Sequence, residues 1–270
     1  MIKDITIGQY FPGNSAIHKI DPRMKIMLMI LYVVMIFLVK SFLGFALVGI
    51  LIMSVIFISG IPFKIVAKSI KPLLFIIVFT ATFNIFYGSG AVVVPNVAWL
   101  SWLTWGGLEK AAFMAIRIIL LIVGTSFVTY TTSPIMLTDA VERLLMPMKY
   151  LKLPVHELSM MMTIAMRFIP TLVDETEKIM NAQKARGADF ETGNVVKRAK
   201  ALIPILIPLI VSSFRRAEDL ADAMECRCYN GGDGRTRYKV YSLKVIDYVS
   251  LVIMLVVLVA VILSNYVGAM

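Results

Sequence analysis

The sequence predicts an all-α integral membrane protein with about five transmembrane helices and a cytoplasmic domain that contains two long amphipathic helices. The chain has 270 residues, 59% of them hydrophobic, and a mean hydropathy of +0.83, which exceeds that of an ordinary soluble globule. Several apolar stretches are long enough to cross a hydrocarbon core of about 30 Å. By contrast, residues 133–244 hold 17 of the 27 basic and 13 of the 17 acidic side chains, so this segment is too polar to span a bilayer.

The first apolar stretch, residues 26–61, must contain two spans. As one helix it would be about 54 Å long, far more than the bilayer core requires. Lys40-Ser41 interrupts it, which predicts a tight hairpin at that point. The predicted spans are 24–39, 42–61, 73–87, 107–132 and 245–267.

The distribution of Lys and Arg predicts the orientation. Basic residues precede the first predicted span and separate the second from the third, as expected of cytoplasmic segments. Residues 88–107 contain no Lys or Arg but hold Trp99, Trp102 and Trp105, which is typical of an outer interfacial belt. The N-terminus is therefore expected in the cytoplasm and the C-terminus outside.

Three regions follow from this pattern. Residues 1–132 form an N-terminal membrane region with four spans, residues 133–244 a cytoplasmic helical domain, and residues 245–270 a C-terminal transmembrane helix. The cytoplasmic region contains six prolines, each expected to end or bend a helix: Pro134, Pro147, Pro154, Pro170, Pro204 and Pro208.

A short pattern occurs twice in the cytoplasmic region. An amphipathic helix follows Pro170 and ends in Ala185-Arg186-Gly187, and a second follows Pro208 and ends in Cys226-Arg227-Cys228. The two triplets are 41 residues apart, and Glu177 and Glu218 each precede the arginine of their triplet by nine residues. We interpret this as an internal repeat.

Each triplet suits insertion into a groove on a partner protein. Small neighbours let another backbone approach, and an arginine presents a rigid fork of donors to carboxylates or carbonyls. The alternative is ordinary capping, because glycine commonly follows a helix and a cation near its C-terminus is stabilised by the helix dipole. Two copies in register favour docking, since capping alone does not require the same triplet twice.

The cysteines and histidines predict no metal site. Cys226 and Cys228 are one residue apart, and His18 and His156 lie in other segments, so no zinc or haem spacing is present. Both thiols are expected to stay reduced in the cytoplasm, and their simplest interpretation is that they are small packing residues.

The order of these motifs resembles a known family. Residues 8–26, "GQYFPGNSAIHKIDPRMKI", and residues 231–237, "GGDGRTR", together with the two triplets, resemble the transmembrane scaffold, or T component, of energy-coupling factor (ECF) vitamin transporters. That family carries two Ala-Arg-Gly-like motifs at the ends of two long coupling helices. Ala185-Arg186-Gly187 matches the first motif, whereas the second triplet retains only Arg227.

The resemblance implies a mechanical role in vitamin or micronutrient uptake. In the family, the scaffold joins a membrane-embedded substrate-binding (S) subunit to two cytosolic ABC-type ATPases, which hydrolyse ATP with Mg, so the scaffold itself binds no cofactor. Both triplets would bind the ATPases. A methionine group would contact the S subunit, although core packing is an equally open interpretation of it: Met160, Met161, Met162 and Met166.

Other function classes find little support. The chain lacks a P-loop, an H-E-x-x-H motif and a G-x-S-x-G elbow, and we interpret the acidic residues 174–177 as a solvated helix face, which disfavours a membrane-bound enzyme. No basic run is interleaved with stacking aromatics, which disfavours nucleic acid. A secondary transporter that works alone would need ionisable residues at mid-membrane depth, and only Arg117 qualifies; a backbone carbonyl or Asn84 is its expected partner.

Overall fold

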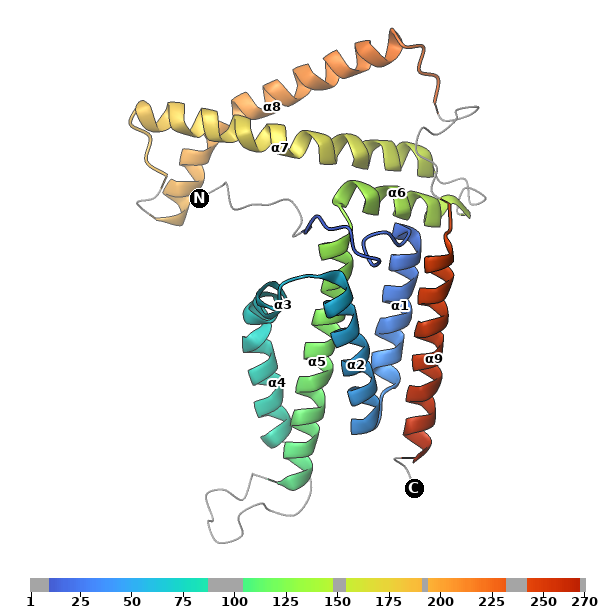
Figure 1. The fold of residues 1–270 in the computed structure, drawn as a ribbon. Helices are drawn as coiled ribbons and strands as arrows, with labels where there is room; N and C mark the ends of the chain where they lie inside the picture. Colours follow the sequence, from blue (N-terminus) through green and yellow to red (C-terminus); the bar gives the residue numbers. More distant parts are fainter. Residues whose placement is uncertain (1–9, 87–103, 148–153, 191–193, 232–241, 268–270) are drawn as a thin grey trace. The chain divides into compact units, whose positions relative to one another are not determined.

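The computed structural model describes residues 10–86, 104–147, 154–190, 194–231 and 242–267. These residues form helices and no strand, which confirms the all-α prediction (Figure 1). A 3₁₀ turn at Lys71–Leu73 joins the third and fourth helices. The α-helices are α1 (Pro22–Leu38), α2 (Phe42–Ser59), α3 (Phe63–Ile70), α4 (Leu74–Phe86), α5 (Trp105–Thr131), α6 (Pro134–Leu145), α7 (Val155–Ala185), α8 (Val195–Glu225) and α9 (Val245–Val267).

The described residues divide into two compact units. The membrane unit draws on Gly8–Ala140 and Val240–Met270, and the helical-arm unit draws on Val141–Lys239. The first contains α1 to α5 and α9, and the second contains α7 and α8. The sequence-based boundaries after residues 132 and 244 stay a prediction.

Four helical segments in the described residues are long and apolar enough to cross a membrane: Phe42–Ser59, Phe63–Phe86, Trp105–Thr131 and Val245–Tyr266. The protein is therefore an all-α membrane protein. The first predicted span corresponds to α1, which has 17 residues, so the count of five spans stays a prediction. The segment with Lys64, Lys68 and Lys71, expected between two spans, is itself helical because α3 leads through the 3₁₀ turn into α4. Of the expected tryptophan belt, Trp99 and Trp102 lie outside the described residues.

Local side-chain caps set the ends of the membrane helices. The hairpin predicted at Lys40-Ser41 separates α1 from α2, and the Ser41 hydroxyl accepts a hydrogen bond from the Gly44 backbone N–H at 3.1 Å. Gly60 ends α2 with a φ of +69°, a conformation that favours glycine. The Thr104 hydroxyl caps α5 in the same way as Ser41 caps α2.

Helices α1 and α9 run parallel, since hydrogen bonds join their two N-terminal ends to each other and their two C-terminal ends to each other. At their N-terminal ends, the carboxylate of Asp247, which is 1% exposed, accepts hydrogen bonds from the backbone N–H groups of Asp21 at 2.8 Å and Lys244 at 2.6 Å. At their C-terminal ends, the Asn265 amide accepts from the Lys40 backbone N–H and donates to the Leu38 carbonyl. Residues 21 and 247 therefore lie at one end of the membrane unit, and residues 40 and 265 at the other.

The core of the membrane unit lies between α1, α2, α5 and α9, which stand side by side in Figure 1. Tyr32 of α1 packs directly on the backbone of α5 at Gly124, where an added Cβ would lie 2.1 Å from the tyrosine ring. The Tyr32 hydroxyl donates to the Leu120 carbonyl at 2.6 Å. A glycine is thus required at position 124 for close approach of the two helices.

Arg117 of α5 has a structural role. Its guanidinium donates to the Val39 carbonyl at 2.8 Å, just after α1, and lies over the rings of Phe113 and Phe45. The expectation of a backbone carbonyl partner is confirmed. The alternative partner, Asn84, instead donates to Thr80 on its own helix. Arg117 therefore joins α5 to the α1–α2 hairpin.

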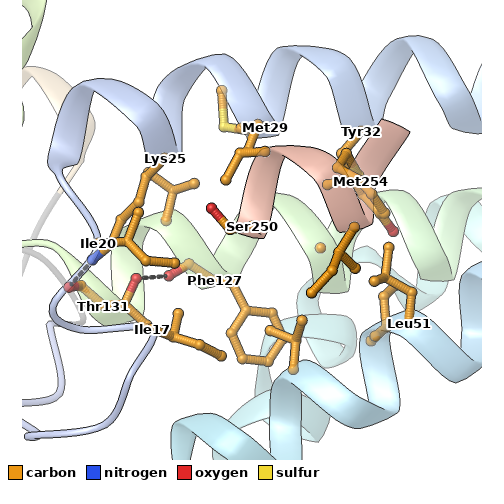
Figure 2. Close-up of a pocket in the computed structure, with 16 residues that line it drawn as sticks. Ile17, Ile20, Lys25, Met29, Tyr32, Leu51, Phe127, Thr131, Ser250 and Met254 are labelled. Atoms are coloured by element: carbon orange, nitrogen blue, oxygen red, sulfur yellow. Dashed lines mark hydrogen bonds between the residues drawn. The ribbon is translucent and has the colours of Figure 1, made fainter. Parts of the chain in front are cut away.

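An apolar cavity of about 180 Å³ lies between the same four helices (Figure 2). Lys25 is the charged residue among those that line it, and its ammonium donates to the Thr131 carbonyl at 2.8 Å and the Thr132 hydroxyl at 3.2 Å. Figure 2 shows the lysine directed toward Thr131 at the edge of the cavity. Because the Lys25 ammonium already donates hydrogen bonds to these two oxygens, the charged group that lines the cavity is not free to bind a polar ligand.

In the helical-arm unit, α7 and α8 have 31 residues each and cross (Figure 1). The prolines act in two ways. Pro134 and Pro154 stand at helix starts, whereas Pro170, Pro204 and Pro208 lie inside helices. These three prolines therefore do not end a helix, because α7 and α8 continue through them. Figure 1 shows α8 bent in its N-terminal half, in agreement with the expectation that a proline bends its helix.

Candidate functional site

The first triplet forms the C-terminal end of α7. The helix ends at Ala185, Arg186 is its C-cap, and Gly187 takes a φ of +88°. The Gly187 backbone N–H donates to the Lys184 carbonyl and the Ala188 N–H donates to the Gln183 carbonyl, both at 3.0 Å. This pair of bonds is a Schellman cap, which reverses the chain and leaves Arg186 at the tip.

The second triplet forms the same cap on α8. The Cys228 backbone N–H donates to the Glu225 carbonyl at 2.8 Å, and the Tyr229 N–H donates to the Met224 carbonyl at 3.0 Å. Cys228 takes a φ of +53° and is the one non-glycine residue with positive φ in the part of the chain that the structure describes. Arg227 therefore occupies the position in α8 that Arg186 occupies in α7, 41 residues earlier.

Capping alone does not explain the second tip. A left-handed conformation costs a non-glycine residue about 1–2 kcal/mol, so a sequence selected only for helix termination would favour glycine at position 228. The same backbone shape nevertheless forms with cysteine. The shared feature of the two tips is the arginine at the C-cap, followed by a reversal of the chain.

All six residues of the two triplets are exposed. Cys226 and Cys228 are free thiols at the surface, so the expectation that they pack is wrong within this chain. No group of three or more metal-binding side chains occurs among the described residues. The tips therefore offer arginines, small side chains and two thiols to a partner.

A polar contact fixes the crossing of α7 and α8. Glu175 of α7 forms an ion pair with Arg216 of α8 and accepts a hydrogen bond from the Ser212 hydroxyl. The pKa of Glu175 is lowered, first by the Ser212 hydroxyl and then by the charge of Arg216, so the pair is ionised at neutral pH. These contacts hold α7 against α8 at the crossing, from which the C-terminal ends of both helices extend.

The crossing lies at equivalent positions of the repeat. The 41-residue offset that relates Arg186 to Arg227 also relates Glu175 to Arg216. Each tip arginine is therefore eleven residues, or about 16 Å of helix, beyond the crossing. The 41-residue repeat can be seen in the sequence, but only the structure shows that Glu175 and Arg216 contact each other.

A second polar contact was not expected from the sequence. Glu142 of α6, which is 9% exposed, accepts a hydrogen bond from the Ser159 hydroxyl at 2.8 Å and lies 3.4 Å from the His156 imidazole. It ties the N-terminal end of α7 to α6. No local signal in the sequence marks this contact, because its partners lie 14 and 17 residues away on the next helix.

The methionine group on α7 is partly exposed. Met161 and Met162 are 55% and 45% exposed, whereas Met160 and Met166 are half-buried. The apolar face of α8 is still more open, with Phe214 68% exposed. Its other exposed apolar residues include Leu202, Ile203, Leu206, Ile207, Ile210 and Val211. A patch of this extent is typical of an interaction surface.

Comparison with known proteins identifies the family. The family model CbiQ, described as "Cobalt transport protein", matches residues 13–238. The chain belongs to this family. It is 52% identical over 271 residues to the "Energy-coupling factor transporter transmembrane protein EcfT" of Ruminiclostridium cellulolyticum, with 99% of each chain covered.

Other relatives carry the same description. The EcfT protein of Clostridium kluyveri is 52% identical, with 98% of each chain covered, and that of Bacillus subtilis is 43% identical, with 88% of this chain and 90% of the relative covered. The resemblance to the transmembrane component of ECF transporters is therefore confirmed over nearly the whole length of the chain.

Proposed function

We propose that this chain is the membrane scaffold of an ECF-type ABC importer. It couples ATP hydrolysis by two cytosolic ATPases to movement of a substrate-binding membrane subunit during vitamin or micronutrient uptake. The observation that carries this proposal is the pair of exposed arginine tips, which share one backbone geometry at equivalent positions of α7 and α8.

Each tip suits a groove on one ATPase. Arg186 and Arg227 would enter the two grooves and pair with carboxylates, while the small flanking residues let the groove walls approach the helix end. Deleting one partner of such a desolvated pair typically costs on the order of 2–5 kcal/mol of binding free energy. The partner carboxylates belong to the ATPases, since this chain leaves both arginine tips exposed.

The crossing lets α7 and α8 transmit movement. Closure of the ATPase dimer draws the two tips together, and the ion pair between Glu175 and Arg216 keeps the helices in contact while they move. The exposed apolar faces near Met161, Met162 and Phe214 would carry this movement to the substrate-binding subunit. Flexible methionines suit a surface that accepts several partners.

The bacterial relatives favour a location in the bacterial plasma membrane, and the topology favours one orientation there. Because α1 and α9 run parallel, the chain enters α1 and leaves α9 at opposite ends of the membrane unit. With basic residues before α1 in the cytoplasm, the C-terminus lies outside. Residues 133–244 then form the cytoplasmic domain.

In this function the chain is a non-catalytic subunit, and ATP and Mg act in the partner ATPases. A secondary transporter that works alone is disfavoured, because the guanidinium of Arg117 binds the Val39 carbonyl and two aromatic rings. This charge, at the α1–α2 hairpin, therefore serves helix packing instead of ion binding.

The double variant Arg186→Glu and Arg227→Glu tests the proposal. We expect it to insert in the membrane normally but to lose ATPase association and uptake, because two carboxylates would now face the acidic residues of the grooves. The measurement is the amount of both ATPases that co-purify with the tagged chain.

The matched control is Arg167→Glu and Arg215→Glu, which makes the same change of charge at exposed positions of α7 and α8 away from the tips. Its co-purification should stay within about twofold of the natural chain. Normal recovery of both ATPases with the tip variant would contradict the proposal.

A further inference from the structure

The two tips share their backbone geometry but differ in the charge of the helices that carry them. We define the α7 arm as residues 176–186 and the α8 arm as residues 217–227, the eleven residues that follow the crossing in each helix. By the 41-residue repeat, the arms are equivalent position by position. Any difference between them therefore reflects their side chains, because length and distance from the crossing are the same.

The α7 arm is basic. It carries three cations and one anion, for a net charge of +2. Lys178, Lys184 and Arg186 are exposed, and the anion, Glu177, is half-buried.

The α8 arm is acidic. It carries Arg227 and four anions, for a net charge of −3. All five charged side chains are exposed: Glu218, Asp219, Asp222, Glu225 and Arg227. Two arms that present the same backbone shape thus differ by five charges.

We propose that the arms distinguish two non-identical ATPase surfaces by charge, and that this fixes the orientation of the scaffold on the ATPase pair. The α7 arm binds the groove whose rim is acidic, and the α8 arm binds the groove whose rim is basic. Both grooves still hold a carboxylate for the tip arginine. This inference rests on the proposed function and adds the rule by which each tip selects its partner.

Electrostatics makes the selection effective. Like charges brought together across an interface cost free energy and slow association, whereas complementary charges steer the encounter. In the wrong orientation, the basic arm would meet a basic rim and the acidic arm an acidic rim. Both contacts would be repulsive at once, so the two arms act together against the reversed complex.

Site-specific crosslinking of the intact complex tests the assignment. Positions 185 and 226 are equivalent in the repeat, so one chain carries Ala185→Cys with Cys226→Ala and Cys228→Gly, and the other keeps Cys226 with Cys228→Gly. Each single thiol receives a photoactivatable crosslinker after assembly with the native ATPases. Mass spectrometry then identifies the ATPase captured by each tip.

We expect the α7 tip to capture the ATPase with the acidic groove rim and the α8 tip to capture the other ATPase. Capture of both ATPases in equal yield by each tip would overturn the inference but leave the proposed function standing. Capture of neither ATPase would overturn the proposed function and the inference with it. Two identical ATPase copies in the native complex would overturn the inference alone.

A charge exchange between the arms provides the second test. The variant Lys178→Glu, Lys184→Glu, Asp219→Lys and Asp222→Lys changes the net charge of the α7 arm from +2 to −2 and that of the α8 arm from −3 to +1. It keeps both arginines and leaves the net charge of the chain unchanged. We expect capture of the original partner to fall at least fivefold at both tips. Unchanged capture would show that charge does not select the partner.

A milder pair of variants controls for general loss of charge. Asp219→Asn with Asp222→Asn removes two anions from the α8 arm, and Glu157→Gln with Asp174→Asn removes two exposed anions from α7 before the crossing. We expect the first pair to slow association roughly three- to tenfold at low salt, and the second pair to leave it within twofold. Equal effects from both pairs would overturn the inference.

Discussion

At the scale of single residues, Cys228 is a strained position. With a φ of +53°, its side chain occupies a backbone conformation that glycine adopts freely. We predict that Cys228→Gly strengthens the cap of α8 by about 1 kcal/mol, because the steric cost of the left-handed conformation disappears. The Tyr229 amide, which closes the cap, should then exchange with solvent deuterium about fivefold more slowly.

Cys226→Ala is the matched control for this prediction, since Cys226 lies in the same turn but has no positive φ. It should leave the exchange of the Tyr229 amide nearly unchanged. Uptake should persist in the double variant Cys226→Ala and Cys228→Gly, which restores an Ala-Arg-Gly triplet. Loss of uptake would show that the thiols have a functional role.

At the scale of the helices, the crossing of α7 and α8 depends on opposite charges at equivalent positions. Glu175→Arg places two arginines at the crossing, so we predict that the distance between the tips increases and becomes broadly distributed. Spin labels on Ala185→Cys and the native Cys226, in a Cys228→Gly background, measure that distance by pulsed electron spin resonance.

The charge exchange Glu175→Arg with Arg216→Glu is the matched control for the crossing, because it restores one acid and one base. It should recover most of the narrow distance distribution. A single Glu175→Arg variant with an unchanged distribution would show that the apolar contacts between α7 and α8 hold the crossing without the ion pair.

The sequence predicted the helices better than their contacts. Apolar stretches and Lys40-Ser41 located α1, α2, α5 and α9 within about two residues, because hydropathy is a local property. The periodic pattern also placed both tips correctly. It left open whether Pro170 and Pro208 end or bend their helices, and the structure shows that α7 and α8 continue through them, since neighbouring turns outweigh the local effect of a proline.

At the scale of the whole molecule, the membrane unit is closed by contacts between residues far apart in the sequence. Asp247 and Asp21 are separated by 226 positions, and the Asp247 carboxylate is fully buried between the starts of α1 and α9. No local pattern predicts such a pair, because a single acidic residue near a predicted span is equally consistent with a solvated helix end. The contact matters because it brings together the first and last membrane helices, which are far apart in the sequence.

The last prediction concerns this closure. Asp247→Asn keeps the shape of the side chain but turns an amide N–H₂ toward one of the two backbone N–H groups that the carboxylate accepts, so one buried hydrogen bond is lost and two donors face each other. We expect a cost of about 1–3 kcal/mol and a fall of roughly 3–10 °C in the thermal unfolding midpoint of the detergent-solubilised protein. Asn265→Ala is the control, because it removes the hydrogen bonds at the opposite, exposed ends of the same helices and should lower the midpoint far less. Equal shifts for the two variants would mean that burial of Asp247 adds nothing to the joining of α1 and α9.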